Sequence, residues 1–204
     1  MIKARILHYA IGPLGVAAIS LITLPFLTWL FPESIVASYT LFFIVMNFGT
    51  MLFSLGLDQS LVRHYFSYEK KSLLLLTLLP GSFFVGSALI IISLYNINLS
   101  EILIGSENSN YAIIIGVLIA FYSRFLSLVL RSEDKALIYS ITQLLPKLVL
   151  LIFLCFVFYQ FFDANEESLY YAILFGMGGA LFLQAFVCFP IIKNSSFFVS
   201  VFFS

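Results

Sequence analysis

Six mostly apolar stretches, each of about 20 residues or more, alternate along the chain with short polar connections. A helix rises ~1.5 Å per residue, so each stretch can cross the ~30 Å hydrocarbon core of a bilayer as a helix. The expected spans cover residues 8–31, 35–57, 73–95, 111–130, 138–161 and 169–191. The pattern predicts an all-α membrane protein that consists of one domain with six transmembrane helices.

The composition agrees with this prediction. The 204 residues are 62% hydrophobic and only 10% charged, with a mean hydropathy of +1.09, whereas soluble domains average about 25% charged residues. Ten basic and ten acidic residues balance each other, so the net charge gives no general attraction to nucleic acid. The first apolar stretch is too long for the core of a signal peptide, and we expect it to remain as a span.

The charged residues between the spans are segregated. Alternate connections hold all the basic residues that lie outside the spans, namely Lys3, Arg5, Arg63, Lys70, Lys71, Arg131, Lys135 and Lys193. The other connections contain no Lys or Arg, and their acidic residues are Glu33, Glu101, Glu107, Asp163, Glu166 and Glu167. Because basic connections stay on the cytoplasmic side of a membrane, both termini are predicted to be cytoplasmic.

Two cations lie inside predicted spans, Arg124 in the fourth and Lys147 in the fifth. An ionised side chain in hydrocarbon costs at least about 2.5–3.5 kcal/mol, so each needs a compensating arrangement. Either cation could extend its side chain to the membrane surface, or pair with Asp58, the only acid at the end of a predicted span. One acid cannot neutralise two cations, so we expect at least one of them to be available to an anion.

Polar residues accompany these cations at helical spacing. Three stripes recur every three or four residues, and they comprise Asn47, Thr50, Ser54 and Asp58; Ser140, Gln143 and Lys147; and Arg124 and Ser127. Such stripes can simply bond neighbouring helices, but three of them beside two cations favour a shared water-filled cavity. The candidate residues for binding an anionic substrate are Arg124, Lys147, Gln143, Asn47, Asp58 and Ser127. Phosphate or pyrophosphate fits this chemistry.

The sequence contains no motif for metal binding, nucleotide binding or nucleophilic catalysis. The sequence has no metal-ligand spacing, no Gly-rich phosphate loop and no nucleophile elbow, so we expect neither an enzyme nor a cofactor or metal. Cys155 and Cys188 lie in apolar stretches and are expected to be inert. Two pairs of small residues, Gly176 with Ala180 and Ser82 with Gly86, have the spacing of close helix packing.

Three segments resemble polysaccharide-transport flippases, the O-antigen and capsule exporters of the multidrug/oligosaccharidyl-lipid/polysaccharide superfamily. They are Ile11-Gly-Pro-Leu-Gly15, Gly56-Leu-Asp-Gln-Ser-Leu-Val-Arg-His-Tyr-Phe66, and the segment from Arg131-Ser-Glu-Asp-Lys135 to Leu145-Pro-Lys147. The resemblance implies one six-helix lobe of a V-shaped transporter in the bacterial inner membrane. It also implies that a lipid-linked oligosaccharide, carried on undecaprenyl pyrophosphate, is flipped by alternating access, with Arg124 and Lys147 receiving its pyrophosphate or acidic sugars.

Family members usually have about twelve spans in two lobes, whereas six are predicted here. The expected partners are therefore membrane lipids, the lipid-linked oligosaccharide, and either a second six-helix lobe or a second copy of the chain. A drug or small-solute antiporter of the same superfamily is an alternative, although it would be expected to hold acids rather than bases in the membrane. A catalytic or non-catalytic subunit of a polysaccharide-assembly complex is a third hypothesis.

Overall fold

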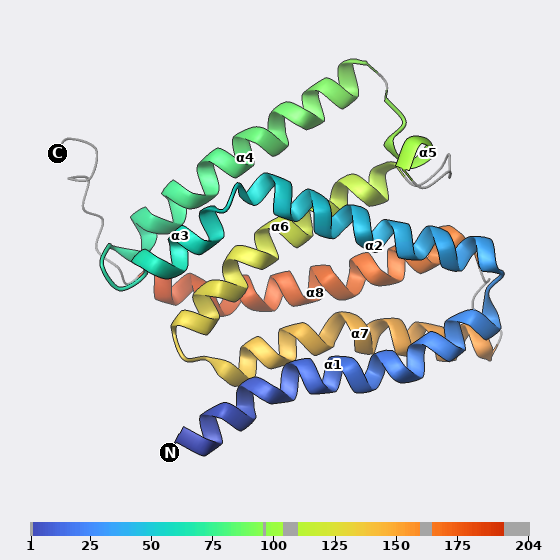
Figure 1. The fold of residues 1–204 in the computed structure, drawn as a ribbon, viewed down its shortest axis with the longest axis horizontal. Helices are drawn as coiled ribbons and strands as arrows, with labels where there is room; N and C mark the ends of the chain where they lie inside the picture. The colour runs from blue at the N-terminus through green and yellow to red at the C-terminus, as the bar shows by residue number, and fades with distance from the viewer. Residues whose placement is uncertain (1, 96, 104–109, 160–164, 194–204) are drawn as a thin grey trace.

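The computed structural model describes residues 2–95, 97–103, 110–159 and 165–193, and these residues form an all-α structure (Figure 1). Its helices are α1 (Ile2–Leu30), α2 (Glu33–Ser54), α3 (Leu57–His64), α4 (Lys70–Leu94), α5 (Leu99–Leu103), α6 (Asn110–Ser132), α7 (Ala136–Phe158) and α8 (Glu166–Lys193). Six of them, all except α3 and α5, are long and apolar enough to cross a membrane. The prediction of an all-α membrane protein with six spanning helices is confirmed.

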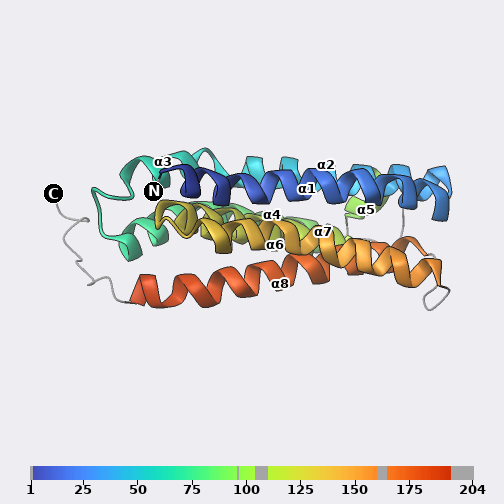
Figure 2. The ribbon, with the colours of Figure 1, turned by 90° about the horizontal axis from the view of Figure 1, so that it is seen from below.

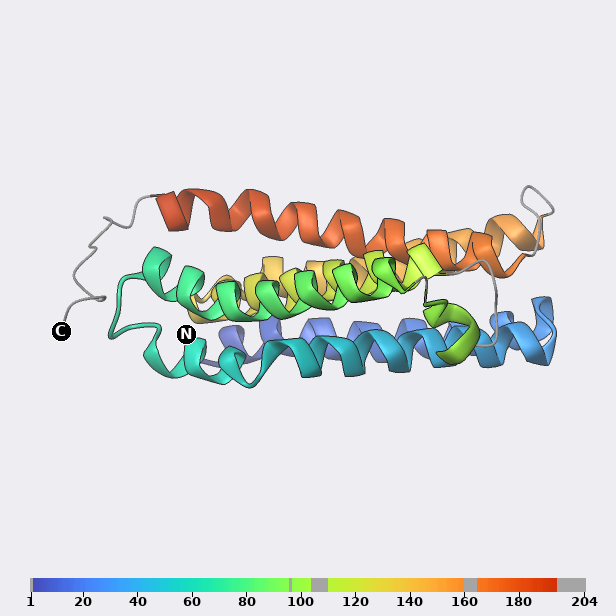
Figure 3. The same ribbon diagram turned by 90° about the horizontal axis from the view of Figure 1, so that it is seen from above.

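The six long helices run roughly along one axis and form three layers. In Figures 2 and 3, α1 and α2 lie in one outer layer, α8 lies in the other, and α4, α6 and α7 lie between them. Helix α7 packs between α1 and α8, and α6 packs between α2 and α8. Helices α1 and α2 meet at the turn around Phe31 and diverge from it towards their opposite ends (Figure 1).

Large apolar side chains fill the contacts between these layers. One cluster joins α1, α2, α6, α7 and α8, and at its centre the ring of Phe42 stacks on Tyr170 with 4.6 Å between ring centroids. A second cluster joins α3, α4, α6 and α8, where Phe121 and Phe125 are completely buried. Each buried aromatic ring removes a large apolar area from water, and a pair of rings adds about 0.5–1.5 kcal/mol of stability beyond that burial.

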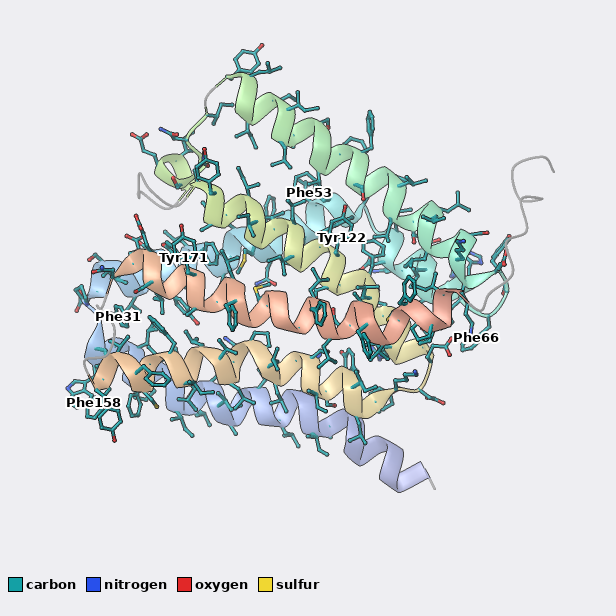
Figure 4. The ribbon with its side chains drawn as sticks, turned by 180° about the vertical axis from the view of Figure 1, so that it is seen from behind. Phe31, Phe53, Phe66, Tyr122, Phe158 and Tyr171 are labelled. Carbon is teal, nitrogen blue, oxygen red and sulfur yellow. The ribbon has the colours of Figure 1, made fainter. Side chains whose placement is uncertain are left out.

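The two ends of the bundle differ in charge and both carry aromatic residues. The end formed by α3, the start of α4 and the α6–α7 turn holds Arg63, Lys70 and Arg131, and is called the basic end below. Exposed Phe66 lies at this end, whereas Phe158 lies at the opposite end (Figure 4). The ring centroids of Phe158 and Trp29 are 5.5 Å apart. Trp and Tyr are typical of membrane interfaces, and exposed Tyr68 near the basic end and Trp29 and Tyr159 near the opposite end agree with this.

The second predicted span ends earlier than the apolar pattern indicates. The pattern continues to residue 57, but α2 ends at Ser54 because Leu55 and Gly56 both adopt the left-handed conformation, with φ of 49° and 74°. The amide of Leu55 then bonds to the carbonyl of Leu52, which closes the helix. The chain restarts as α3, so part of the expected 58–72 connection is a helix.

The expected close packing is found at Gly176 but not at Gly86. A Cβ atom added to Gly176 would lie 2.9 Å from the Cα of Pro146 in α7, so α7 and α8 approach closely there. A Cβ atom on Gly86 would meet nothing within 4 Å, so that prediction is wrong. The close contact of α4 lies at Gly81, where an added Cβ would be 2.7 Å from the carbonyl oxygen of Phe53.

Replacing Gly176 tests whether this packing holds α8 in place. We expect Gly176→Ala to lower the free energy of unfolding by about 1–3 kcal/mol, because the methyl group meets the α7 backbone rather than a flexible side chain. Gly178→Ala is the matched control, since a Cβ there meets nothing within 4 Å. The measurement is the denaturation midpoint in detergent. Equal midpoints for the two variants would contradict the close approach.

Candidate functional site

The break between α2 and α3 determines where Asp58 lies. Gly56 precedes α3, and its φ of 74° is a conformation that glycine adopts without steric cost. The change in chain direction puts Asp58 in the first turn of α3, where the positive end of the helix dipole favours a carboxylate. The Asp58 side chain is buried there and faces α6.

Arg124 of α6 pairs with Asp58. Its Nε and Nη2 atoms both donate to the same oxygen, Oδ2 of Asp58, at 3.0 and 2.6 Å. Arg124 lies eight residues before the end of α6, or ~12 Å inside it by helix rise. The Arg124 side chain keeps 42% of its surface exposed against 10% for Asp58, so the pair lies at the edge of the bundle. The sequence allowed Arg124 either to extend to the membrane surface or to pair with Asp58, and the structure has the ion pair.

Lys147 of α7 has a different environment. It lies eleven residues after Ala136, or ~16 Å into a helix of ~34 Å, which is close to its middle. Its Nζ atom lies 4.6 Å from the ring centroid of Phe43 in α2, within the range of a cation–π interaction. Among the described residues it forms neither a hydrogen bond nor an ion pair, so Lys147 is a half-buried cation without an anion.

The remaining candidates are divided between these two cations. Ser127 donates to the carbonyl of Arg124 at 2.7 Å, one turn along α6. Gln143 lies one turn before Lys147 and donates to the hydroxyl of Tyr139 at 2.8 Å. Asn47 is exposed on α2 and donates to the carbonyl of Phe43 at 2.8 Å, so it lies one turn from the ring that Lys147 contacts. The six candidates thus form one group around Asp58 and one around Lys147.

A cavity of about 610 Å³ opens beside the first group. Asp58 lines it, together with Gln59, Ser60, Arg63 and His64 of α3. Of the six candidates, Asp58 lines this cavity. Ser127 and Asn47 instead donate to carbonyls of their own helices. The sequence did not single out Arg63 or His64, since both read as ordinary residues of a basic connection.

A second polar cluster ties α3 and α4 to the end of α6. The Tyr65 hydroxyl donates to Oε1 of Glu133 at 2.6 Å, and Nζ of Lys70 lies 2.5 Å from the same atom. Burial favours a higher pKa for Glu133, but these two hydrogen bonds and the charges of Lys70 and Lys135 outweigh it and lower the pKa. Burial and the Glu133 carboxylate raise the pKa of Tyr65. The cluster fixes α3 against α6, and so supports the Asp58–Arg124 contact.

The described residues contain no group of three or more His, Cys, Asp or Glu that could hold a metal ion. Free Cys155 and Cys188 lie in α7 and α8. No protein-family model, curated protein or solved structure matches the chain. The site offers one neutralised cation, Arg124, at the edge of the bundle, and one cation without an anion among the described residues, Lys147, near the middle of α7.

A double-mutant cycle measures the Asp58–Arg124 pair. We expect Arg124→Ala and Asp58→Ala each to lower the free energy of unfolding by about 1.5–3 kcal/mol, because each leaves an ion at the edge of the bundle without its partner. The double variant should cost clearly less than the sum of the two. Additive losses in denaturation by detergent would mean that the two side chains do not interact.

Proposed function

We propose that the chain forms one six-helix lobe of a carrier for an anionic, lipid-linked oligosaccharide in a bacterial inner membrane. In this proposal the basic end faces the cytoplasm, as the segregation of Lys and Arg indicates. The pyrophosphate of the substrate enters from that side. A second lobe, either another chain or a second copy of this one, completes the transport path.

Lys147 is the observation that carries the proposal. A lysine near the middle of a spanning helix costs several kcal/mol unless it is compensated. A cation–π interaction with the Phe43 ring stabilises the ammonium group by about 2 kcal/mol or more in a desolvated setting. The ring attracts the cation but does not neutralise its charge. A cation held in this way can exchange its aromatic partner for an arriving anion, and a pyrophosphate supplies the charge that the described surroundings of Lys147 lack.

The arrangement of charge supports a carrier over the alternatives. A cation-coupled antiporter needs an acid that can bind and release the coupling ion in the membrane. Asp58 already binds Arg124, so it is not free for that role. The resemblance of residues 56–66 and 131–147 to polysaccharide flippases covers the segments that hold Asp58 and Lys147. No specific observation favours a subunit of an assembly complex.

The first test is binding of a short-chain polyprenyl pyrophosphate to the purified chain in detergent. We expect Lys147→Ala to weaken binding roughly tenfold or more, because a charge-assisted contact to phosphate is lost. Lys147→Arg keeps the charge and should remain within a few-fold of the unaltered chain. Lys135→Ala, at the membrane surface, is the matched control and should have little effect.

The same variants can be scored for surface polysaccharide in a bacterial strain that lacks its own flippase. We expect that, when a second copy supplies the other lobe, the unaltered chain restores the polysaccharide and Lys147→Ala does not, at equal protein levels. Equal restoration by both would contradict a role for Lys147 in transport. Pyrophosphate binding without restoration would leave the binding site intact but contradict transport by this chain alone.

A further inference from the structure

Two cavities adjoin each other at α3. The 610 Å³ cavity has a polar wall that includes Gln59, Ser60, Arg63 and His64. A second cavity of about 290 Å³ lies between α3 and α4. Ser60 and His64 line both cavities, so the two are neighbours along the same helix. The function proposed above uses neither of them.

The first cavity is suited to an anion. Asp58, its acidic residue, is already bound to Arg124, which cancels its charge. Arg63 is exposed and forms no ion pair among the described residues, so its guanidinium is available. Gln59 and Ser60 add an amide and a hydroxyl that can donate hydrogen bonds. Guanidinium and neutral donors on one wall are the groups that bind phosphate.

The second cavity is suited to hydrocarbon. Leucines from α3 and α4 line it, namely Leu57, Leu73 and Leu76, while Tyr68, Ser72 and Thr77 add polar groups. The Thr77 hydroxyl already donates to carbonyls of its own helix. His64 packs edge-on against the ring of Tyr68 at 5.5 Å, so an aromatic pair stands at the junction of the two cavities. A ligand that fills both must therefore have an anionic group and an apolar chain joined together.

The position of α3 agrees with such a ligand. Val62 and Phe66 are 47% and 84% exposed on the same segment as Arg63, and Figure 4 shows Phe66 at the edge of the basic end. Exposed apolar residues beside a cation are typical of a short segment that lies at the level of the lipid headgroups. At that level, the anionic lipids of the membrane carry both a phosphate and apolar chains.

We propose that the two cavities that flank α3 form a binding site for an anionic phospholipid. Its phosphate lies against Arg63 and His64, and one of its hydrocarbon chains lies between α3 and α4. Arg63 supplies the charge, and Gln59 and Ser60 supply neutral donors. The site is separate from Lys147 and does not depend on the transport function. It requires a lipid rather than free phosphate, since only a lipid fills the apolar cavity as well.

Native mass spectrometry of the full chain in neutral detergent tests this site. We expect phosphatidylglycerol to remain bound more strongly than zwitterionic phosphatidylcholine. Arg63→Gln should weaken phosphatidylglycerol binding roughly tenfold or more, because a charge-assisted contact to phosphate is lost. Arg131→Gln removes the same charge from the same end, outside both cavities, and should change binding less than twofold.

Three results would overturn the proposal. Equal losses in Arg63→Gln and Arg131→Gln would show general attraction to a basic surface rather than a site. Equal binding of phosphatidylglycerol and phosphatidylcholine would remove the role of the anionic charge. Binding of glycerol phosphate, which has the headgroup chemistry but no chain, as tightly as phosphatidylglycerol would identify a free-phosphate site and exclude the apolar cavity from recognition. Both variants change exposed side chains, so folding is expected to be unaffected.

Discussion

Hydrocarbon offers no water to polar groups, and this constraint determines how the polar side chains of the spanning helices are placed. Thr50 and Thr77 donate to carbonyls one turn back on their own helices. Arg124 cannot be satisfied in this way and takes Asp58, the acid that the α2–α3 break brings to it. Lys147 lies on α7, where its cationic group contacts the ring of Phe43 rather than an acid of the described residues. The two cations of the spanning helices therefore differ, since an acid neutralises one of them and not the other.

The spans could be predicted from the sequence because length and hydropathy determine which segments cross a membrane. The break at Leu55 and Gly56 could not be predicted. The apolar pattern continues across it, and a left-handed leucine has no reliable sequence signal. The shortage of acids relative to cations in the spans could be predicted from the sequence. The pairing of Asp58 with Arg124 depends on the path of α3, which is a property of tertiary packing. The anchoring of α3 by Glu133 was likewise hidden, because that residue reads as an ordinary turn charge.

The cationic side chains lie at different depths along the bundle. Arg63 lies at the basic end beside a cavity whose neighbouring cavity is apolar, which suits a lipid of the surrounding membrane. Lys147 lies ~16 Å into α7, beside the ring of Phe43 in α2. Between the two, the Asp58–Arg124 pair is internally neutral. A surface site for lipid and a deeper site for a transported anion can therefore coexist in one six-helix unit without competing for the same charge.

The proposed function requires that water and anions reach Lys147, and thiol labelling measures that access. In a chain with serine at positions 155 and 188, Lys147→Cys is exposed to a membrane-impermeant, negatively charged methanethiosulfonate from the basic end. Only a thiolate in contact with water reacts. We expect rapid labelling of Lys147→Cys and little labelling of Leu148→Cys, the next residue along α7, whose native side chain is 42% exposed on the bundle surface. Equal rates at the two positions, or no labelling at either, would contradict it.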